Sequence, residues 1–346
     1  MSSFTNIHWQ QLLRSAITQN ASDLHLTAGQ RPFLRYNGQL SAAELPIPDS
    51  SQLEEIIFSL LTEQQKETFL KQNELDFAWS YSGRRFRFNI YRQRENLALA
   101  GRLIPENIAA LSDLGCPIIL NELLKKEHGL ILVTGRTGSG KTTTLAAFLA
   151  AAAQQKSQHI ITLEDPVEYL IPTGNSFISQ REYGTDFFSF SQALKSALRQ
   201  DPNILLIGEL RDSETIRTAL DAASTGHLVL ATLHTNSAAE TILRLESFFP
   251  AEIQHLRTQL AAVLLATVNQ RLLPKLGGGR VAAFEVMTST PAIANLIRNG
   301  KCQQLPSAIL SGKNYGMSTL ANSVDQLLQN NKISAETASL YMGGDL

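Results

Sequence analysis

Apolar and polar positions along the first hundred residues follow two different periods. Residues 5–20 carry apolar side chains at helical spacing, which predicts an amphipathic helix, and residues 49–72 show a second helical pattern. Two segments with an alternating pattern turn at residues 37–38 (Asn-Gly) and 82–83 (Ser-Gly), and each predicts a β-hairpin. The N-terminal part is therefore predicted to be a small antiparallel sheet with helices, an α+β domain.

From residue 129 onward, short apolar runs alternate with helical patterns. These runs are 130–133, 160–163, 204–207 and 228–232. Such alternation predicts a mostly parallel sheet with helices on both faces, and ligands of these sheets bind at the carboxyl ends of the strands. A last strand is predicted at 280–286, with a helical chain after it. The expected fold class is α/β, with domains at 1–104 and 119–346 joined by a linker at 105–118.

The composition narrows the kind of protein without identifying it. With 43% hydrophobic and 18% charged residues, a chain of 346 residues can bury a globular core. A net charge of −1 argues against bulk nucleic-acid binding. No segment approaches the ~20 continuous apolar residues of a membrane span, and the first residues show no secretory signal. Cys116 and Cys302 lie far apart, so we expect reduced thiols in a cytosolic protein and no cysteine-based zinc site.

The most specific signal is a glycine-rich loop that begins at Gly135 and ends in Lys141-Thr142, with the spacing G-x-x-x-x-G-K-[ST]. It lies between a predicted strand and a predicted helix, which is the context that a phosphate-binding P-loop requires. Lys141 can reach the β- and γ-phosphates of ATP, and the Thr142 hydroxyl can ligate Mg²⁺. The residues expected to contact the nucleotide are Gly135, Arg136, Thr137, Gly138, Ser139, Gly140, Lys141, Thr142, Thr143 and, farther along the chain, His227.

Acidic side chains follow two of the predicted strands. Glu164, Asp165 and Glu168 come directly after the strand at 160–163, where they are placed to orient a water or a metal ion, although a solvated acidic turn has the same composition. Glu209 closes the strand at 204–207. An acidic residue at the end of a buried strand downstream of a P-loop is the Walker B pattern, so we expect Glu209 to hold Mg²⁺ directly or through water.

Two further sets of side chains are candidates for the same site. His227 and His234 bracket the strand at 228–232, and His234, at its carboxyl end, is placed to sense the γ-phosphate or to relay a contact to a neighbouring subunit. Arginines, among them Arg85 and Arg87, crowd one face of the second hairpin. This stripe is either a solvated strand face or a source of an arginine for a phosphate site, since such an arginine can accelerate phosphoryl transfer.

These motifs, in this order, resemble those of the secretion ATPases, which serve type II and type IV secretion and type IV pili. The matching boxes are Walker A at 135–142, the Asp box at 164–168, Walker B at 207–212 and the His box at 225–235. The similarity runs nearly end to end, from residues 21–29 to 316–320. Within this superfamily the chain is most similar to the retraction ATPases of type IV pili. Assembly ATPases usually carry an extra N-terminal domain and a four-cysteine zinc module, which this sequence does not show.

The resemblance implies a ring-shaped homo-hexamer that hydrolyses ATP with Mg²⁺. Each subunit would have an N-terminal PAS-like domain and a C-terminal RecA-like domain. By motif position, Glu168 matches the water-activating glutamate, Glu209 the Walker B acid, and His227 and His234 the His-box pair. Arg85, Arg87 and Arg102 fall where the family offers arginines to the nucleotide phosphates. The implied location is cytoplasmic, at the inner face of the cytoplasmic membrane, through an inner-membrane platform protein of the pilus and without nucleic acid.

One helix departs from the retraction pattern. The family typically has Ala-Ile-Arg-Asn-Leu-Ile-Arg-Glu in this helix, whereas Ala294 and Asn299 stand here in place of the first arginine and the glutamate. ATP hydrolysis should survive this change, but a paralogue with altered coupling to the pilus stays open. An assembly ATPase, a nucleic-acid motor and a nucleotide sensor without turnover stay open as well.

Overall fold

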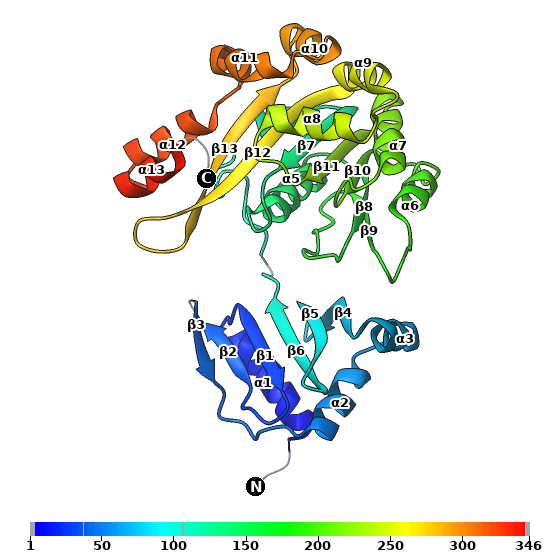
Figure 1. Cartoon of the computed structure of the whole chain (residues 1–346), viewed down its shortest axis with the longest axis vertical. Coiled ribbons are helices and arrows are strands. Elements are labelled where there is room, and N and C mark those ends of the chain that lie inside the picture. The colour runs from blue at the N-terminus through cyan, green and yellow to red at the C-terminus, as the bar shows by residue number, and fades with distance from the viewer. Residues whose placement is uncertain (1–3, 37, 106, 343–346) are drawn as a thin grey trace. The chain divides into compact units, whose positions relative to one another are not determined.

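The computed structural model describes residues 4–36, 38–105 and 107–342, which form two compact units (Figure 1). The first comprises Met1–Asn107 together with Pro166–Leu170, and the second comprises Ile108–Asp165 and Ile171–Leu346. The short segment Pro166–Leu170, which contains Glu168, thus groups with the N-terminal unit although it lies within the C-terminal part of the sequence. The hydrophobic patterns of the chain account for the elements of each unit.

Among its described residues, the N-terminal unit is an antiparallel sheet of six strands with three helices. The strand order is β3-β2-β1-β6-β5-β4. The strands are β1 (Asp23–Thr27), β2 (Phe33–Tyr36), β3 (Gln39–Ala42), β4 (Glu74–Tyr81), β5 (Arg84–Gln93) and β6 (Asn96–Leu103), and the helices are α1 (Asn6–Thr18), α2 (Ser50–Ser59) and α3 (Glu63–Gln72). The predicted α+β class is confirmed for this unit.

Both predicted hairpins are present. Tyr36 pairs with Gln39 and Tyr81 pairs with Arg84 at the two tight turns, although Asn37 itself lies outside the described residues. The helical stretch at 49–72 is two helices, because Thr62 adopts an extended conformation and its hydroxyl accepts a hydrogen bond from the backbone N–H of Gln65 at 3.3 Å. A threonine in this position begins a new helix.

The alternation along β5 separates a core face from a charged face. Phe86, Phe88 and Ile90 are completely buried and belong to the apolar core of this unit. Arg85 and Arg87 point to the opposite face, as the period of two requires. The core therefore fixes the direction in which these arginines project.

The C-terminal unit is built on a seven-stranded sheet in the order β13-β12-β7-β11-β10-β8-β9. All neighbouring strands are parallel except β12 and β13, which form an antiparallel hairpin. The strands are β7 (Gly129–Thr134), β8 (His159–Glu164), β9 (Phe177–Glu182), β10 (Ile204–Ile207), β11 (Leu228–Leu233), β12 (Leu264–Pro274) and β13 (Arg280–Thr288). The four predicted apolar strands are the central ones, and the predicted α/β class is confirmed.

Helices cover this sheet, and the chain after β13 is helical as predicted (Figure 1). The helices are α4 (Ile119–Leu123), α5 (Lys141–Gln155), α6 (Phe190–Ala197), α7 (Ser213–Ser224), α8 (Ala238–Ser247), α9 (Ile253–Val263), α10 (Pro291–Arg298), α11 (Leu305–Ser311), α12 (Leu320–Gln329) and α13 (Ala335–Met342), with 3₁₀ turns η1 (Cys302–Gln304) and η2 (Lys313–Tyr315). Within the residues that the structure describes, none of these helices has both the length and the apolar character that a bilayer crossing demands.

A buried ion pair anchors the region around α10. Arg257 on α9 donates two hydrogen bonds to Glu246 on α8, at 2.8 and 3.0 Å, and the Glu246 side chain is only 6% exposed. The Arg257 guanidinium also lies against Gly300, where an added Cβ would come within 2.4 Å of it. A side chain at position 300 would be strained, because Gly300 has a φ of +68° and the Arg257 guanidinium would have to shift.

Replacing Arg257 with alanine is expected to lower the free energy of unfolding by about 3 kcal/mol, because the Glu246 carboxylate would be left buried without its cation. Urea unfolding followed by circular dichroism measures this loss. The control is Lys125→Ala, which removes an ion pair to Glu122 whose side chains are 66% and 57% exposed and should cost at most about 0.5 kcal/mol. Equal losses in the two variants would contradict the assignment of a buried anchor.

Candidate active site

Positive backbone φ angles shape the glycine-rich loop between β7 and α5. Gly135, Gly138 and Gly140 have φ angles of +145°, +76° and +89°. A Cβ on Gly135 would lie 2.4 Å from the Gln270 carbonyl oxygen, and one on Gly140 would lie 2.8 Å from the Gln270 amide nitrogen. The loop can therefore curl against β12 only with glycine at these two positions, as the P-loop prediction requires.

Lys141 begins α5 and folds back over the loop. Its ammonium group donates to the carbonyl oxygens of Gly135 and Arg136, at 2.8 and 3.1 Å. Burial lowers the pKa of Lys141, while the nearby Glu209 carboxylate acts in the opposite direction. The ammonium group is thus held at the mouth of the loop, beside the first backbone N–H groups of α5, where an anion is favoured.

The loop also contains a buried hydroxyl that is available to a ligand. The Oγ atom of Ser139 is buried and has no hydrogen-bond partner among the residues that the structure describes. Buried polar atoms are nearly always paired in native proteins. A polyphosphate in the loop would supply acceptors for this hydroxyl and for Lys141, so the residues present fit a nucleotide.

Glu209, directly after β10, lies beside the loop as the Walker B prediction expects. One of its carboxylate oxygens is 3.4 Å from Nε2 of His234, and the other accepts from Nε of Arg211 at 2.8 Å. Arg211 also reaches Asp165, with NH1 at 3.3 Å from Oδ2. Thr137 of the loop is 3.5 Å from Nδ1 of His234. The loop after β7 and the carboxyl ends of β8, β10 and β11 thus bring five charged or polar side chains together.

His234 connects the loop to Glu209. Its partial burial and the charge of Lys141 lower the pKa of His234, while the Glu209 carboxylate acts in the opposite direction. A neutral imidazole that donates from Nε2 to Glu209 accepts at Nδ1 from the Thr137 hydroxyl. This tautomer satisfies both contacts at once, so His234 joins Thr137 of the loop to the Glu209 carboxylate.

His227 does not lie with this group. It precedes β11, where its ring nitrogen Nδ1 is 3.1 Å from the carbonyl oxygen of Ala222 and its own carbonyl accepts from Gly129, the first residue of β7. The six residues of β11 separate the two histidines by about 20 Å at the usual rise of a strand. Within one chain, the position of His227 therefore does not support the expected contact with the nucleotide.

The arginine stripe of the N-terminal unit has two different parts. Arg85 donates to the carbonyl oxygen of Val167 at 2.8 Å, and Arg87 is 3.2 Å from the carboxylate of Glu168. Arg102 is 70% exposed and pairs with Asp23 at 3.0 Å. Arg102 therefore belongs to a solvated strand face. Arg85 and Arg87 instead hold the segment that carries Glu168, the expected water activator.

The three acidic residues at the end of β8 also have different partners. Glu164 is buried and accepts from Thr162 at 2.6 Å and from Gln180 at 3.1 Å, which makes it part of the sheet edge. Asp165 pairs with Arg211, and Glu168 pairs with Arg87. The three carboxylates that the sequence groups together thus have three different sets of neighbours.

Polar residues of β12 were not expected in the site. Asn269 is fully buried and donates to the Thr134 hydroxyl and to the Thr235 carbonyl, at 3.0 and 2.8 Å. Gln270 accepts from the Thr144 hydroxyl at 2.8 Å and lies against the loop glycines. The signal in the sequence is a pair of amides that directly follows a mostly apolar run. This pair holds the P-loop against the neighbouring strand.

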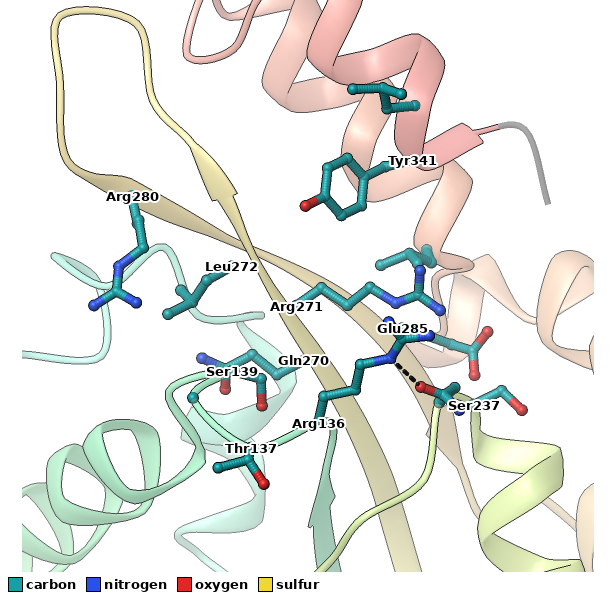
Figure 2. A pocket seen from close by; sticks show the side chains of 14 residues that line it. Arg136, Thr137, Ser139, Ser237, Gln270, Arg271, Leu272, Arg280, Glu285 and Tyr341 are labelled. Carbon is teal, nitrogen blue, oxygen red and sulfur yellow. Dashed lines mark hydrogen bonds between the residues drawn. The ribbon is translucent and has the colours of Figure 1, made fainter. Parts of the chain in front are cut away.

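A pocket of about 580 Å³ opens beside the loop (Figure 2). Its lining comprises Arg136, Thr137, Gly138, Ser139, Asn236, Ser237, Gln270, Arg271, Leu272, Arg280, Glu285, Leu320, Leu340 and Tyr341. In Figure 2, Arg136 extends from the loop toward Ser237, and its Nε donates to Asn236 at 2.9 Å. The lining has three arginines and one glutamate, so its charge favours an anion. Its leucine and tyrosine side chains offer a surface for an apolar part of the same ligand.

Magnesium fits the donor set although it needs ligands from outside the chain. No group of three or more histidine, cysteine, aspartate or glutamate side chains that could hold a metal occurs in the described part of the chain. Mg²⁺ is usually held by one or two protein oxygens together with phosphates and waters. The Thr142 hydroxyl and the Glu209 carboxylate are such oxygens, so they would hold the ion only when a nucleotide is bound.

A parallel sheet with a P-loop, a Walker B acid and an edge hairpin defines a P-loop nucleotide-binding protein with a RecA-like core. The chain belongs to the family of type II/IV secretion system proteins, whose sequence model matches residues 115–341. This finding confirms the resemblance that the ordered motifs indicate.

Three relatives are similar over nearly the whole chain. The uncharacterized protein YggR of Escherichia coli is 46% identical over 319 residues, which cover 92% of this chain and 97% of YggR. The type IV pilus retraction ATPase PilT of Pseudomonas aeruginosa is 44% identical over 330 residues, covering 95% and 96% of the two chains. The crystal structure of the pilus retraction motor PilT with bound ADP matches with a TM-score of 0.89 and 40% identity, covering 96% of each chain.

Proposed function

We propose that this chain is a Mg²⁺-dependent motor ATPase that retracts type IV pili and so drives twitching motility. The observation that carries the proposal is the similarity to PilT over 95% of the chain, in a structure that retains Lys141, Thr142 and Glu209 at one edge of the sheet. An ATPase that binds nucleotide in this way must also have a group that activates water. Glu168 is that candidate by its position in the Asp box.

In this proposal the side chains divide the work of hydrolysis. The loop and Lys141 bind the β- and γ-phosphates, while Thr142 and Glu209 hold Mg²⁺, which neutralises the developing negative charge. Glu168 polarises the attacking water, and Arg87 fixes the orientation of the Glu168 carboxylate through their 3.2 Å contact. Arg102, which the resemblance offers to the γ-phosphate, would have to leave Asp23 before it could stabilise charge there. Positioning and electrostatics supply most of the acceleration in this reaction class.

The mechanical part of the proposal rests on the resemblance to the secretion ATPases. We place the chain in a homo-hexameric ring in the cytoplasm, at the inner face of the cytoplasmic membrane, docked to an inner-membrane platform protein of the pilus. Hydrolysis would be coupled to a rigid-body movement between the two units, and this movement would be the output of the motor. The arrangement requires no nucleic acid.

Deletion of the gene tests the proposed function. We expect the deletion strain to carry more surface pili than the parent and to lose twitching motility, since pili would assemble without being withdrawn. Electron microscopy of surface pili and a surface-motility assay measure both effects, with a plasmid copy of the gene as the control. Loss of pili would instead favour an assembly ATPase, and stimulation of the purified ATPase by DNA would favour a nucleic-acid motor.

A second candidate is a paralogue whose hydrolysis is coupled differently to the pilus. Its support is the change in α10, where Ala294 packs against the apolar core and Asn299 ends the helix by donating to the carbonyl of Asn295 at 2.9 Å. Neither side chain offers the charge that stands at this position in the retraction pattern. A deletion strain with normal pili and normal motility would favour this candidate.

A further inference from the structure

Arg211 contacts the proposed metal acid with the best geometry of any side chain around it. Its Nε atom donates to Oε2 of Glu209 at 2.8 Å, while NH1 is 3.3 Å from Oδ2 of Asp165. The second oxygen of Glu209 is near His234, so both carboxylate oxygens already have a neighbour. A cation that approaches Glu209 must therefore share it with the guanidinium of Arg211.

Burial and hydrogen bonds hold the backbone around this pair. Leu210, between the two charged residues, is 2% exposed, and its N–H donates to the carbonyl of Thr232 at 3.1 Å. The Thr232 hydroxyl in turn donates to the carbonyl of Gly208. Glu209 and Arg211 thus project from a strand end that β11 holds in place.

The ion pair between Arg211 and Glu209 is weak enough to be exchanged. The side chains of Arg211, Glu209 and Asp165 are 58%, 25% and 33% exposed, and ion pairs with this exposure are weak because water screens them. Asp165 offers Arg211 a second carboxylate within reach. The guanidinium can therefore leave Glu209 without losing its last anionic partner.

We propose that Arg211 is a positioning residue that competes with Mg²⁺ for Glu209 and takes Asp165 as its alternative partner, so that Arg211 sets the Mg²⁺ concentration at which nucleotide binds. The inference rests on the proposed ATPase function, which assigns Mg²⁺ to Glu209. Two cations cannot both have full use of one carboxylate, and the arginine must be moved before the ion gains its ligand. Removing Arg211 should therefore strengthen the binding of Mg²⁺ at Glu209, and removing Asp165 should weaken it.

The test is an equilibrium titration of the full chain with Mg²⁺ in the presence of a fixed concentration of fluorescent methylanthraniloyl-ATP. For Arg211→Gln, the Mg²⁺ concentration at half-saturation is expected to fall about threefold to fivefold. For Asp165→Asn, it is expected to rise, because Arg211 keeps Glu209 as its only carboxylate. The control is Arg217→Gln, which removes a half-buried arginine paired with Glu252 at 3.0 Å and should leave the half-saturation point unchanged.

The opposite directions of the two variants separate competition from a loss of structure. Misfolding would weaken nucleotide binding in both variants. Competition instead predicts a lower half-saturating Mg²⁺ concentration in Arg211→Gln and a higher one in Asp165→Asn. A half-saturation point in Arg211→Gln that stays within twofold of the wild type, or that rises, overturns the inference while the proposed function stands. Failure of the wild-type chain to bind the analogue with Mg²⁺ overturns the proposed function instead.

Discussion

Replacing Lys141 with alanine is expected to lower the rate of ATP hydrolysis by about 100- to 1000-fold, the usual effect of removing one preorganised donor from a developing anion. The Lys141 ammonium group is buried at the mouth of the loop, and its two partners are carbonyl oxygens of Gly135 and Arg136. No other ammonium group belongs to the loop, so the charge on the β- and γ-phosphates would be left without its nearest cation.

Phosphate release by the purified chain measures this loss at saturating ATP and Mg²⁺. Lys156→Ala is the matched control, because Lys156 is an exposed lysine at the other end of α5 and should leave the rate unchanged. A rate for Lys141→Ala within tenfold of the wild type would contradict the assignment of the loop as the phosphate site. Binding of the fluorescent ATP analogue should weaken in parallel.

Replacing Glu168 with glutamine is expected to lower kcat by about 100- to 10,000-fold, the range that a positioned general base contributes. Glutamine keeps the size of the side chain and a carbonyl oxygen for Arg87, but it cannot accept a proton from water. Nucleotide affinity should change by less than about threefold, since the phosphate loop is untouched. The prediction thus separates a loss of chemistry from a loss of binding.

Steady-state hydrolysis and equilibrium binding of the fluorescent analogue measure the two quantities separately. Glu127→Gln, at an exposed position, is the control that removes a carboxylate without touching the site. Steady-state activity of Glu168→Gln near that of the wild type would show that another group activates the water. Equal losses of binding and activity would indicate a structural role for Glu168 instead.

Features with a local cause could be predicted from the sequence. The strands β7, β8, β10 and β11 are continuous apolar runs because both faces of a parallel sheet are covered, and the P-loop needs glycines at fixed spacing. Glu209 was predictable for the same reason, since only Gly208 separates it from one of these runs. The position of Arg211 also has a local cause. Leu210 is buried between Glu209 and Arg211, so the two charged side chains project to the same side.

Features that depend on distant pairing could not be predicted. β12 carries the amides Asn269 and Gln270, and its partner β7 lies more than a hundred residues earlier, so no local period marks it as a strand. The contact between Arg87 and Glu168 joins residues 81 positions apart. His227 and His234 look alike as neighbours of one strand, yet they lie at opposite ends of it.

The most direct test of the central claim replaces the chromosomal gene with the Glu168→Gln allele and counts surface pili together with twitching motility. This experiment keeps the protein in place and removes only the proposed chemistry. The account predicts excess surface pili and no twitching, as in the deletion strain, because ATP would bind without being hydrolysed. Normal numbers of pili and normal motility, with the variant present at the wild-type level, would contradict it.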